Sequence, residues 1–213
     1  MASISERFSD NVLVRKGRFV WEFYLRFLRR KSTPLAPMVK QRLLKNYAEK
    51  FGLKVLVETG TYMGETVSAL EGDFAEIYSI ELDDRLYERA KRKFRNHRNV
   101  HVVHGDSAIE LPLLISGIDQ PCLFWLDAHK CGTSARAAQD TPIEKELQCL
   151  IRRTYLNDVI LIDDAANFNG RHDYPTIDDI SKTVLESGKG WTVEVKHDII
   201  RIHMTDPISE MWR

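Results

Sequence analysis

Cysteine is scarce and long apolar runs are missing from this chain of 213 residues. Only Cys122, Cys131 and Cys149 occur, an odd number without C-x-x-C spacing, which disfavours a disulfide framework or a zinc site and suits reduced thiols. No apolar stretch approaches the roughly 18 residues of a membrane-spanning helix, and no signal-peptide core precedes a small-residue cleavage site. We therefore expect a cytoplasmic protein.

Net charge is missing as well. The 31 lysines and arginines equal the 31 aspartates and glutamates in number, which gives no indication of bulk nucleic-acid binding. The charge is unevenly spread, because residues 1–31 hold eight basic and three acidic residues and are +5, which leaves residues 32–213 at −5. Residues 12–31 predict a helix with one broad apolar face, and a second short helix ends near Phe51. We expect this N-terminal helical appendage, residues 1–51, to pack on the domain or on a second copy in a homo-oligomer. Peripheral contact with an anionic membrane is the alternative.

Short apolar runs alternate with amphipathic stretches from residue 53 onward. The predicted strands cover residues 53–57, 76–81, 100–104, 122–126, 159–162, 191–195 and 199–204. The predicted helices cover residues 64–71, 84–95, 107–116, 141–151 and 176–186. The last two helices should begin with capping boxes, Thr141 with Glu144 and Thr176 with Asp179. This alternation predicts an α/β domain over residues 52–213, with a parallel sheet covered by helices on both faces.

Acidic residues follow the predicted strands. Sheets of this kind bind ligands beyond the carboxyl ends of their strands, so these positions form the expected site. They are Glu58, Glu81, Asp106, Asp127, Asp163 and Asp164.

The first three strands end in motifs that suit an adenosyl ligand. Glycines at 60 and 64 allow a sharp turn and the close approach of a ligand to the backbone, although a plain strand-to-helix turn would also need them. Glu81 can accept both hydroxyls of a ribose, or can simply be a solvated strand-end acid. In Gly105-Asp106-Ser107, a carboxylate and a hydroxyl could bind the amino edge of a purine.

Together, Glu58-Thr-Gly-x-x-x-Gly64, Glu81 and Gly105-Asp106-Ser107 resemble the first three motifs of class I S-adenosylmethionine-dependent methyltransferases. The resemblance covers residues 53–204 and implies a Rossmann-like sheet of seven strands in the order 3-2-1-4-5-7-6, with the last strand antiparallel. Tyr62 stands where the middle glycine of the family motif would be. The cofactor site that the resemblance implies consists of Glu58, Thr59, Gly60, Thr61, Tyr62, Gly64, Thr66, Glu81, Asp106, Ser107 and Asp127.

Three aspartates follow the fourth and fifth strands. Asp127, Asp163 and Asp164 would repel one another unless a cation compensates, and Mg²⁺ with oxygen ligands could bind a pair of substrate hydroxyls there. Asp163 or Asp164 could instead cap the following segment. The arrangement is similar to that of the metal-dependent sugar O-methyltransferases of macrolide and aminocoumarin sugars. That resemblance implies Asp127, Asp163 and Asp164 as metal ligands.

His129 lies two residues beyond Asp127 and could take the proton of the acceptor, because its unperturbed pKa is near neutrality. An exposed or supporting histidine is the alternative. We therefore regard His129 and Asp127 as the catalytic candidates. His172 and Tyr174 could border the acceptor pocket or could pack at the start of a helix.

The leading hypothesis is an S-adenosylmethionine-dependent O-methyltransferase, assisted by Mg²⁺, that acts on a hydroxyl of a sugar or small polyol by direct methyl transfer. The alternatives are a catechol or nitrogen acceptor, or a non-catalytic module that binds the cofactor. The missing G-x-G-x-x-G fingerprint disfavours a nicotinamide-dependent oxidoreductase. No Asp/Asn-Pro-Pro-Tyr/Phe follows the fourth strand, which disfavours nucleobase-amine methylation. We thus expect a small-molecule acceptor and no nucleic-acid partner.

Overall fold

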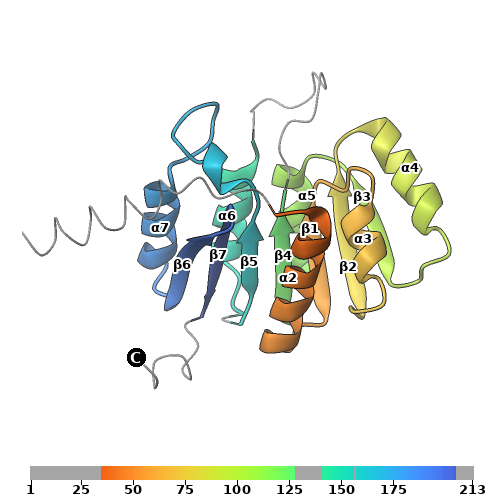
Figure 1. Cartoon of the computed structure of the whole chain (residues 1–213), viewed down its shortest axis with the longest axis horizontal. Coiled ribbons are helices and arrows are strands. Elements are labelled where there is room, and N and C mark those ends of the chain that lie inside the picture. The colour runs from red at the N-terminus through yellow and green to blue at the C-terminus, as the bar shows by residue number, and fades with distance from the viewer. Residues whose placement is uncertain (1–34, 128–140, 156, 205–213) are drawn as a thin grey trace, which may run out of the picture. The chain divides into compact units, whose positions relative to one another are not determined.

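The computed structural model describes residues 35–127, 141–155 and 157–204 (Figure 1). The helix predicted over residues 12–31 lies outside these residues, and so does His129.

None of the helices in these ranges combines the length and the apolar character that crossing a membrane requires. Cys122 and Cys149, the cysteines within the same ranges, are free thiols.

Strands and helices alternate along the chain as predicted. The strands are β1 (Val55–Thr59), β2 (Glu76–Glu81), β3 (Val100–His104), β4 (Cys122–Leu126), β5 (Val159–Ile162), β6 (Trp191–Lys196) and β7 (Ile199–Met204). The helices are α2 (Pro37–Phe51), α3 (Glu65–Leu70), α4 (Asp84–Phe94), α5 (Ser107–Ser116), α6 (Ile143–Ile151) and α7 (Ile177–Glu186), with a 3₁₀ turn, η1, at Ala165–Asn167.

One sheet of seven strands organises the structure, in the order β3-β2-β1-β4-β5-β7-β6. The pairs among β3, β2, β1, β4 and β5 are parallel, whereas β7 runs antiparallel to both β5 and β6. This topology confirms the predicted order and the reversed last strand. The ends of β3, β2, β1, β4 and β5 that point the same way therefore form one edge, which we call the carboxyl edge of the sheet.

Helices cover both faces of the sheet (Figure 1). Helices α2, α3 and α4 pack on one face around Leu56, Leu123 and Leu161, while α5, α6 and α7 pack on the other around Val57, Phe124 and Ile160. Every residue of the central strands β1, β4 and β5 is buried. Continuous apolar runs are what a sheet covered on both faces requires.

Helix α2 belongs to the same core as the sheet. Pro37 occupies its first turn, where no backbone N–H is needed, and Gly52 ends it in a left-handed conformation at φ 66°. Its side chains Leu44 and Ala48 are buried in the cluster that contains Leu56. Lys40 lies one turn before Leu44 and hence on the same side of the helix. This packing brings the start of α2 to the carboxyl edge.

One predicted capping box is present and the other is wrong. Thr176 caps α7 reciprocally with Asp179, as predicted. At α6 the N-cap residue is Pro142, and no side chain caps the helix. The buried Thr141 Oγ1 accepts a hydrogen bond from Ile143 N at 3.3 Å, one residue too early in the chain to form a box with Glu144.

The hairpin between β6 and β7 supports the carboxyl edge. Its two turn residues, His197 and Asp198, have positive φ values of 54° and 63°, as a two-residue hairpin turn demands. The buried Asp198 accepts hydrogen bonds from the backbone N–H groups of Ala165 and Ala166, each at 2.8 Å. The hairpin therefore fixes the segment that follows β5.

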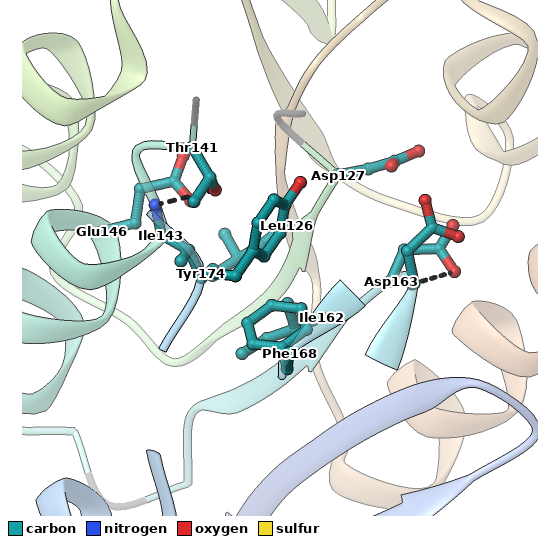
Figure 2. Close-up of a pocket in the computed structure, with 10 residues that line it drawn as sticks. Leu126, Asp127, Thr141, Ile143, Glu146, Ile162, Asp163, Phe168 and Tyr174 are labelled. Atoms are coloured by element: carbon teal, nitrogen blue, oxygen red, sulfur yellow. Dashed lines mark hydrogen bonds between the residues drawn. The ribbon is translucent and has the colours of Figure 1, made fainter. Parts of the chain in front are cut away.

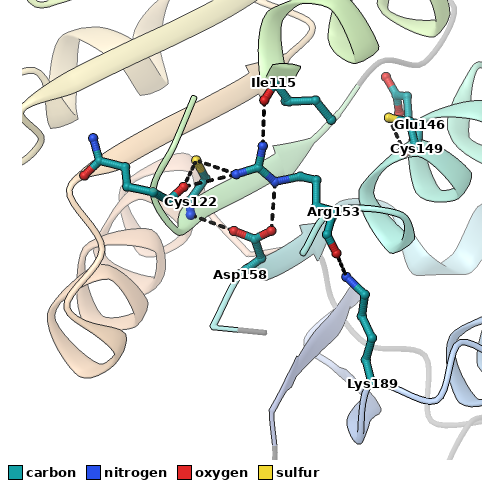
Figure 3. Close-up of polar contacts among 8 residues, drawn as sticks. Ile115, Cys122, Glu146, Cys149, Arg153, Asp158 and Lys189 are labelled. Carbon is teal, nitrogen blue, oxygen red and sulfur yellow. Dashed lines mark hydrogen bonds and ion pairs between the residues drawn. The ribbon is translucent and has the colours of Figure 1, made fainter. Parts of the chain in front are cut away.

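A buried ion pair lies at the opposite edge of the sheet (Figure 3). Arg153 Nε is 2.9 Å from Asp158 Oδ2, and the two side chains are 6 % and 1 % exposed. The guanidinium also donates to the carbonyl oxygens of Ile115 and Gln120, at 2.9 and 3.0 Å. Asp158 Oδ1 accepts the backbone N–H of Cys122 at 2.8 Å, which joins the starts of β4 and β5.

Candidate active site

The carboxyl edge brings all six predicted acids to one side of the sheet. Backbone hydrogen bonds connect the strand ends directly, from Gly105 N to Glu81 O, Gly60 N to Ile80 O, Asp127 N to Thr59 O and Asp163 N to Leu126 O, at 2.9, 2.9, 3.1 and 3.0 Å. The residues after β3, β2, β1, β4 and β5 thus form a continuous row. The prediction that these acids lie at one edge of the sheet is confirmed, while their place in a functional site and their individual roles remain predictions.

The loop after β1 follows a left-handed path. Gly60, Tyr62 and Gly64 have φ values of 87°, 49° and 65°. Glu81 Oε2 holds this path by accepting the backbone N–H of Tyr62 at 2.8 Å. The tyrosine side chain is 58 % exposed, so its ring stands outside the core beside the loop. The chain therefore keeps a glycine-like backbone at Tyr62 without a glycine.

Replacing Gly64 by alanine should lower the free energy of unfolding by about 2–3 kcal/mol. A left-handed alanine costs about 1–2 kcal/mol by itself. In addition, a Cβ at Gly64 would lie 2.8 Å from Cε2 of the buried Phe94 ring. Gly188→Ala is the matched control, because Gly188 has φ 69° and no atom within 4 Å of its Cβ position. In urea unfolding Gly64→Ala should lose more than Gly188→Ala; equal losses would mean that the Phe94 contact relaxes freely.

Glu58 lies beneath the same loop. It is 2 % exposed, and Ser79 Oγ donates to Glu58 Oε2 at 2.5 Å while forming a 2.7 Å hydrogen bond with Thr61 Oγ1. Burial raises the pKa of Glu58 to about 8, against the opposing hydrogen bonds from Ser79 and Thr66. The nearby charges of Asp127 and Glu81 raise it further. A buried carboxyl of this kind is poised to become charged when a cationic ligand group arrives.

The acid that ends β2 and the acid that follows β3 are fixed in orientation by the backbone. Glu81 Oε1 accepts the N–H of Asp83 at 2.9 Å, so both oxygens of this carboxylate have backbone donors. Asp106 is the N-cap of α5 and accepts the N–H of Ala108 at 2.9 Å with Oδ1. Ser107 follows it and is buried. Each carboxylate is thus held in place before any ligand binds.

A pocket of about 250 Å³, including the part open to solvent, lies over the ends of β4 and β5. In Figure 2, Asp127 and Asp163 stand on one side of it and Thr141 and Glu146 on the other. The rings of Phe168 and Tyr174 also line it and meet edge to face, with their centroids 5.2 Å apart. The remaining lining residues are Leu126, Ile143, Ile162 and Asp164. Tyr174 therefore borders this pocket, which was one of the two alternatives predicted for it; the other was packing at the start of a helix.

Lys40 is a site residue that no sequence pattern pointed to. Its ammonium forms an ion pair and hydrogen bond with Asp163 Oδ2 and lies 6.0 Å from the centroid of the Trp125 ring. Burial raises the pKa of Asp163 to about 6, against the opposing Lys40 contact. Burial alone would lower the pKa of Lys40, but Asp163, Asp127 and Asp164 together raise it. This lysine is therefore a charged ammonium at neutral pH.

The described residues do not fit the Mg²⁺ ion that the resemblance implies. Asp163 Oδ2 is engaged by Lys40, and Asp163 Oδ1 accepts the N–H of Asp164 at 3.0 Å. Within residues 35–127, 141–155 and 157–204, no three His, Cys, Asp or Glu side chains gather closely enough to hold a metal. The alternative role predicted for these aspartates, capping of the following segment, is not observed either. Asp164 is the N-cap residue of η1, but no side chain caps this turn.

Glu146 is a second residue that was missed, although its position gave a signal. It lies on α6 between Ile143 and Leu147, on the face that the apolar spacing predicts to be buried, and it is 1 % exposed. Burial raises its pKa to about 7, against the opposing effect of the neighbouring Ser107 hydroxyl. A charged residue type on a buried helix face already suggests a ligand site or a neutral carboxyl.

Comparisons with known proteins identify the fold. No family model and no curated protein matches the chain. Among solved structures, the SAH-bound methyltransferase PaMTH1 of Podospora anserina is 16 % identical, with a TM-score of 0.52 over 97 % of this chain and 99 % of that one. The O-methyltransferase TomG of Streptomyces achromogenes is 16 % identical, with a TM-score of 0.56 over 86 % of each chain. The 23S rRNA methyltransferase ErmE is 14 % identical, with a TM-score of 0.50 over 81 % of this chain and 70 % of that one. The chain therefore has the fold of these methyltransferases.

Proposed function

We propose that this chain is an S-adenosylmethionine-dependent methyltransferase that methylates a hydroxyl of a small molecule. The observation that carries the proposal is the row of oriented acids Glu58, Glu81 and Asp106 beside a left-handed loop. These groups lie at the carboxyl edge, where an α/β sheet binds its ligand. The shared fold with solved methyltransferases supports the same function.

The residues of this edge would divide the cofactor between them. Glu81 would hold the ribose hydroxyls, and Asp106 with Ser107 would hold the adenine. Glu58 and Gly60 would flank the methionine portion, with the turn through Thr59, Thr61, Tyr62, Gly64 and Thr66 against the ligand. When bound, S-adenosylmethionine supplies an activated methyl group on a sulfonium. The positive charge of that ligand would favour the ionised form of Glu58.

The acceptor would occupy the pocket over β4 and β5. Asp127, Asp163 and Tyr174 place oxygen atoms around an apolar floor of Leu126 and Ile162. Carboxylates accept hydrogen bonds from hydroxyl groups, so a sugar or small polyol fits this lining. Asp127 would accept the proton or orient the hydroxyl, and His129 remains the other candidate base. Because ErmE shares the fold, the fold alone does not select the acceptor, and a catechol or nitrogen acceptor stays the second candidate.

Mg²⁺ is not carried into the proposal, because Lys40 engages Asp163. A cytoplasmic location and a homo-oligomer formed through the N-terminal helix remain predictions. The predicted boundary at residue 51 is wrong for α2, because Leu44 and Ala48 of this helix are buried in the core of the sheet domain.

Calorimetry with S-adenosylhomocysteine (SAH) tests the proposal directly. We expect SAH to bind one to one at micromolar concentration and NAD not to bind. Asp106→Asn should weaken SAH binding about tenfold, since a hydrogen bond to a charged group contributes about 1.5–3 kcal/mol. Asparagine preserves the cap of α5, so stability should change little.

Asp119→Asn is the control, because Asp119 is exposed in the loop between α5 and β4 at the opposite edge. Its SAH affinity should equal that of the original chain. Absence of SAH binding would refute the proposed function. With SAH binding established, transfer of a labelled methyl group to a panel of sugars, catechols and amines would identify the acceptor class.

A further inference from the structure

The ammonium group of Lys40 lies near the aspartates that end β4 and β5 and forms an ion pair with Asp163. Lys40 comes from α2, 123 residues before its partner Asp163. The lysine side chain is 22 % exposed and the aspartate side chain 3 %, so the pair is largely shielded from water. Asp127 and Asp164 lie close enough to act on the Lys40 charge electrostatically. The position of Lys40 is fixed because α2 is anchored in the core by Leu44 and Ala48.

An ammonium and a divalent cation would compete for the same carboxylates. Converging acids require a positive charge, and either kind of cation can supply it. With Asp163 Oδ2 engaged by Lys40 and Asp163 Oδ1 engaged by the Asp164 N–H, a metal could bind Asp163 only after displacing one of them. The ammonium differs from a metal in being covalently attached and permanently present.

We propose that Lys40 is the resident cation of the acceptor pocket, a positioning residue that holds Asp163 and balances Asp127 and Asp164 in place of a divalent metal. The proposal has two parts. With Lys40 in place, no three acids of the described residues gather closely enough to hold a metal. Removing the ammonium should let the aspartates close on a divalent cation, and this first part does not depend on any activity. Methyl transfer should be independent of added metal, and this second part rests on the proposed function.

A purely structural role is the competing explanation, in which the ion pair only fastens α2 to the sheet. The chain offers a matched control on the same helix. Lys45 forms an ion pair with Asp73, with side chains 46 % and 26 % exposed, and the charge of Glu49 also acts on it. Lys45→Met removes a lysine–aspartate pair from α2 without touching the pocket.

The test measures Mn²⁺ binding by electron paramagnetic resonance and calorimetry. We expect the original chain and Lys45→Met to bind no Mn²⁺ at millimolar concentration. Lys40→Met should bind Mn²⁺ at least tenfold more tightly, and adding Asp163→Asn should abolish the gain. Lys40→Gln, which removes the charge but keeps a donor for Asp163, should show the same gain if Lys40→Met does not fold.

Activity gives the second readout once an acceptor is known. The original enzyme should keep its rate in a chelator, whereas Lys40→Met should lose at least tenfold in kcat with an unchanged SAH affinity, and Lys40→Arg should retain most of the rate. The proposal is overturned if the original chain binds Mn²⁺ through Asp163, or if both neutral variants fold without gaining Mn²⁺ binding. A failure of SAH binding would instead refute the proposed function and leave the Mn²⁺ result standing.

Discussion

Asp158→Asn should lower the free energy of unfolding by about 3–5 kcal/mol, because it leaves the buried Arg153 guanidinium without its counter-charge. Asparagine can still accept the N–H of Cys122, so the loss would come from the charge and not from the backbone contact. Burial raises the pKa of Asp158, against the opposing hydrogen bond from the Cys122 N–H and the opposing charge of Arg153. Urea unfolding at pH 7 measures the effect.

A double-mutant cycle measures the interaction energy between Arg153 and Asp158 separately from their contacts with other groups. Arg153→Met should also be strongly destabilising. It removes the donor to the carbonyl oxygens of Ile115 and Gln120, and it leaves Asp158 without its counter-charge. The double variant Arg153→Met with Asp158→Asn should lose clearly less than the sum of the single losses, because no buried charge remains unpaired. Glu88→Gln is the control, as it breaks an exposed pair with Arg92 and should change stability by less than about 0.5 kcal/mol. Strict additivity in the cycle would contradict the account.

Stability of the ligand-free protein should fall by several kcal/mol as the pH rises from 5 to 8.5, and Glu58→Gln should remove much of that fall. The pKa of Glu58 is raised to about 8 in the folded chain, mainly by burial, from an ordinary value of 4.5. The unfolded chain therefore releases this proton first, so the contribution is complete below pH 4.5 and is lost as the pH rises toward 8. Each pKa unit corresponds to about 1.4 kcal/mol.

Chemical unfolding at pH 5.5, 7 and 8.5 tests this expectation. Glu146, with its pKa raised to about 7, contributes in the same direction, so Glu58→Gln should leave a smaller slope that the further change Glu146→Gln reduces. Glu186→Gln alters a carboxyl whose side chain is 67 % exposed and should leave the profile unchanged. A Glu58→Gln variant with the original pH profile would show that Glu58 is already ionised in the folded protein.

The fold could be predicted because its local signals agree with one another. The predicted bounds of β2, β3, β4 and β5 match the structure, since each contains apolar residues and is bounded by polar segments. Strand β1 was predicted two residues too early, because Glu58 and Thr59 look like turn residues although both are buried. The alternation of strands and helices along the chain was enough to predict the parallel sheet. The position of the reversed strand was implied only by the resemblance to class I methyltransferases.

The site could be predicted only as far as strand ends determine it. The row of acids follows from the topology, but the partner of Asp163 does not, since Lys40 is distant in sequence and sits on a helix assigned to the appendage. The charge of Asp127 raises the pKa of Asp163, as expected for neighbouring acids, whereas the ion pair of Asp163 with Lys40 was not predicted. Glu146 could have been found from its helical spacing. Residues 128–140 form no apolar pattern that would predict their position.

Strand β7 has a consequence for how this protein is made. It is the last strand of the sheet in the chain, yet it lies inside the sheet between β5 and β6. During synthesis on the ribosome, β5 therefore keeps one unpaired edge until residues up to 204 have emerged, and an exposed edge invites pairing with other chains. The same strand brings Ile200 and Ile202 into the core. A premature stop codon before residue 199 would thus leave a chain that lacks β7 and tends to aggregate.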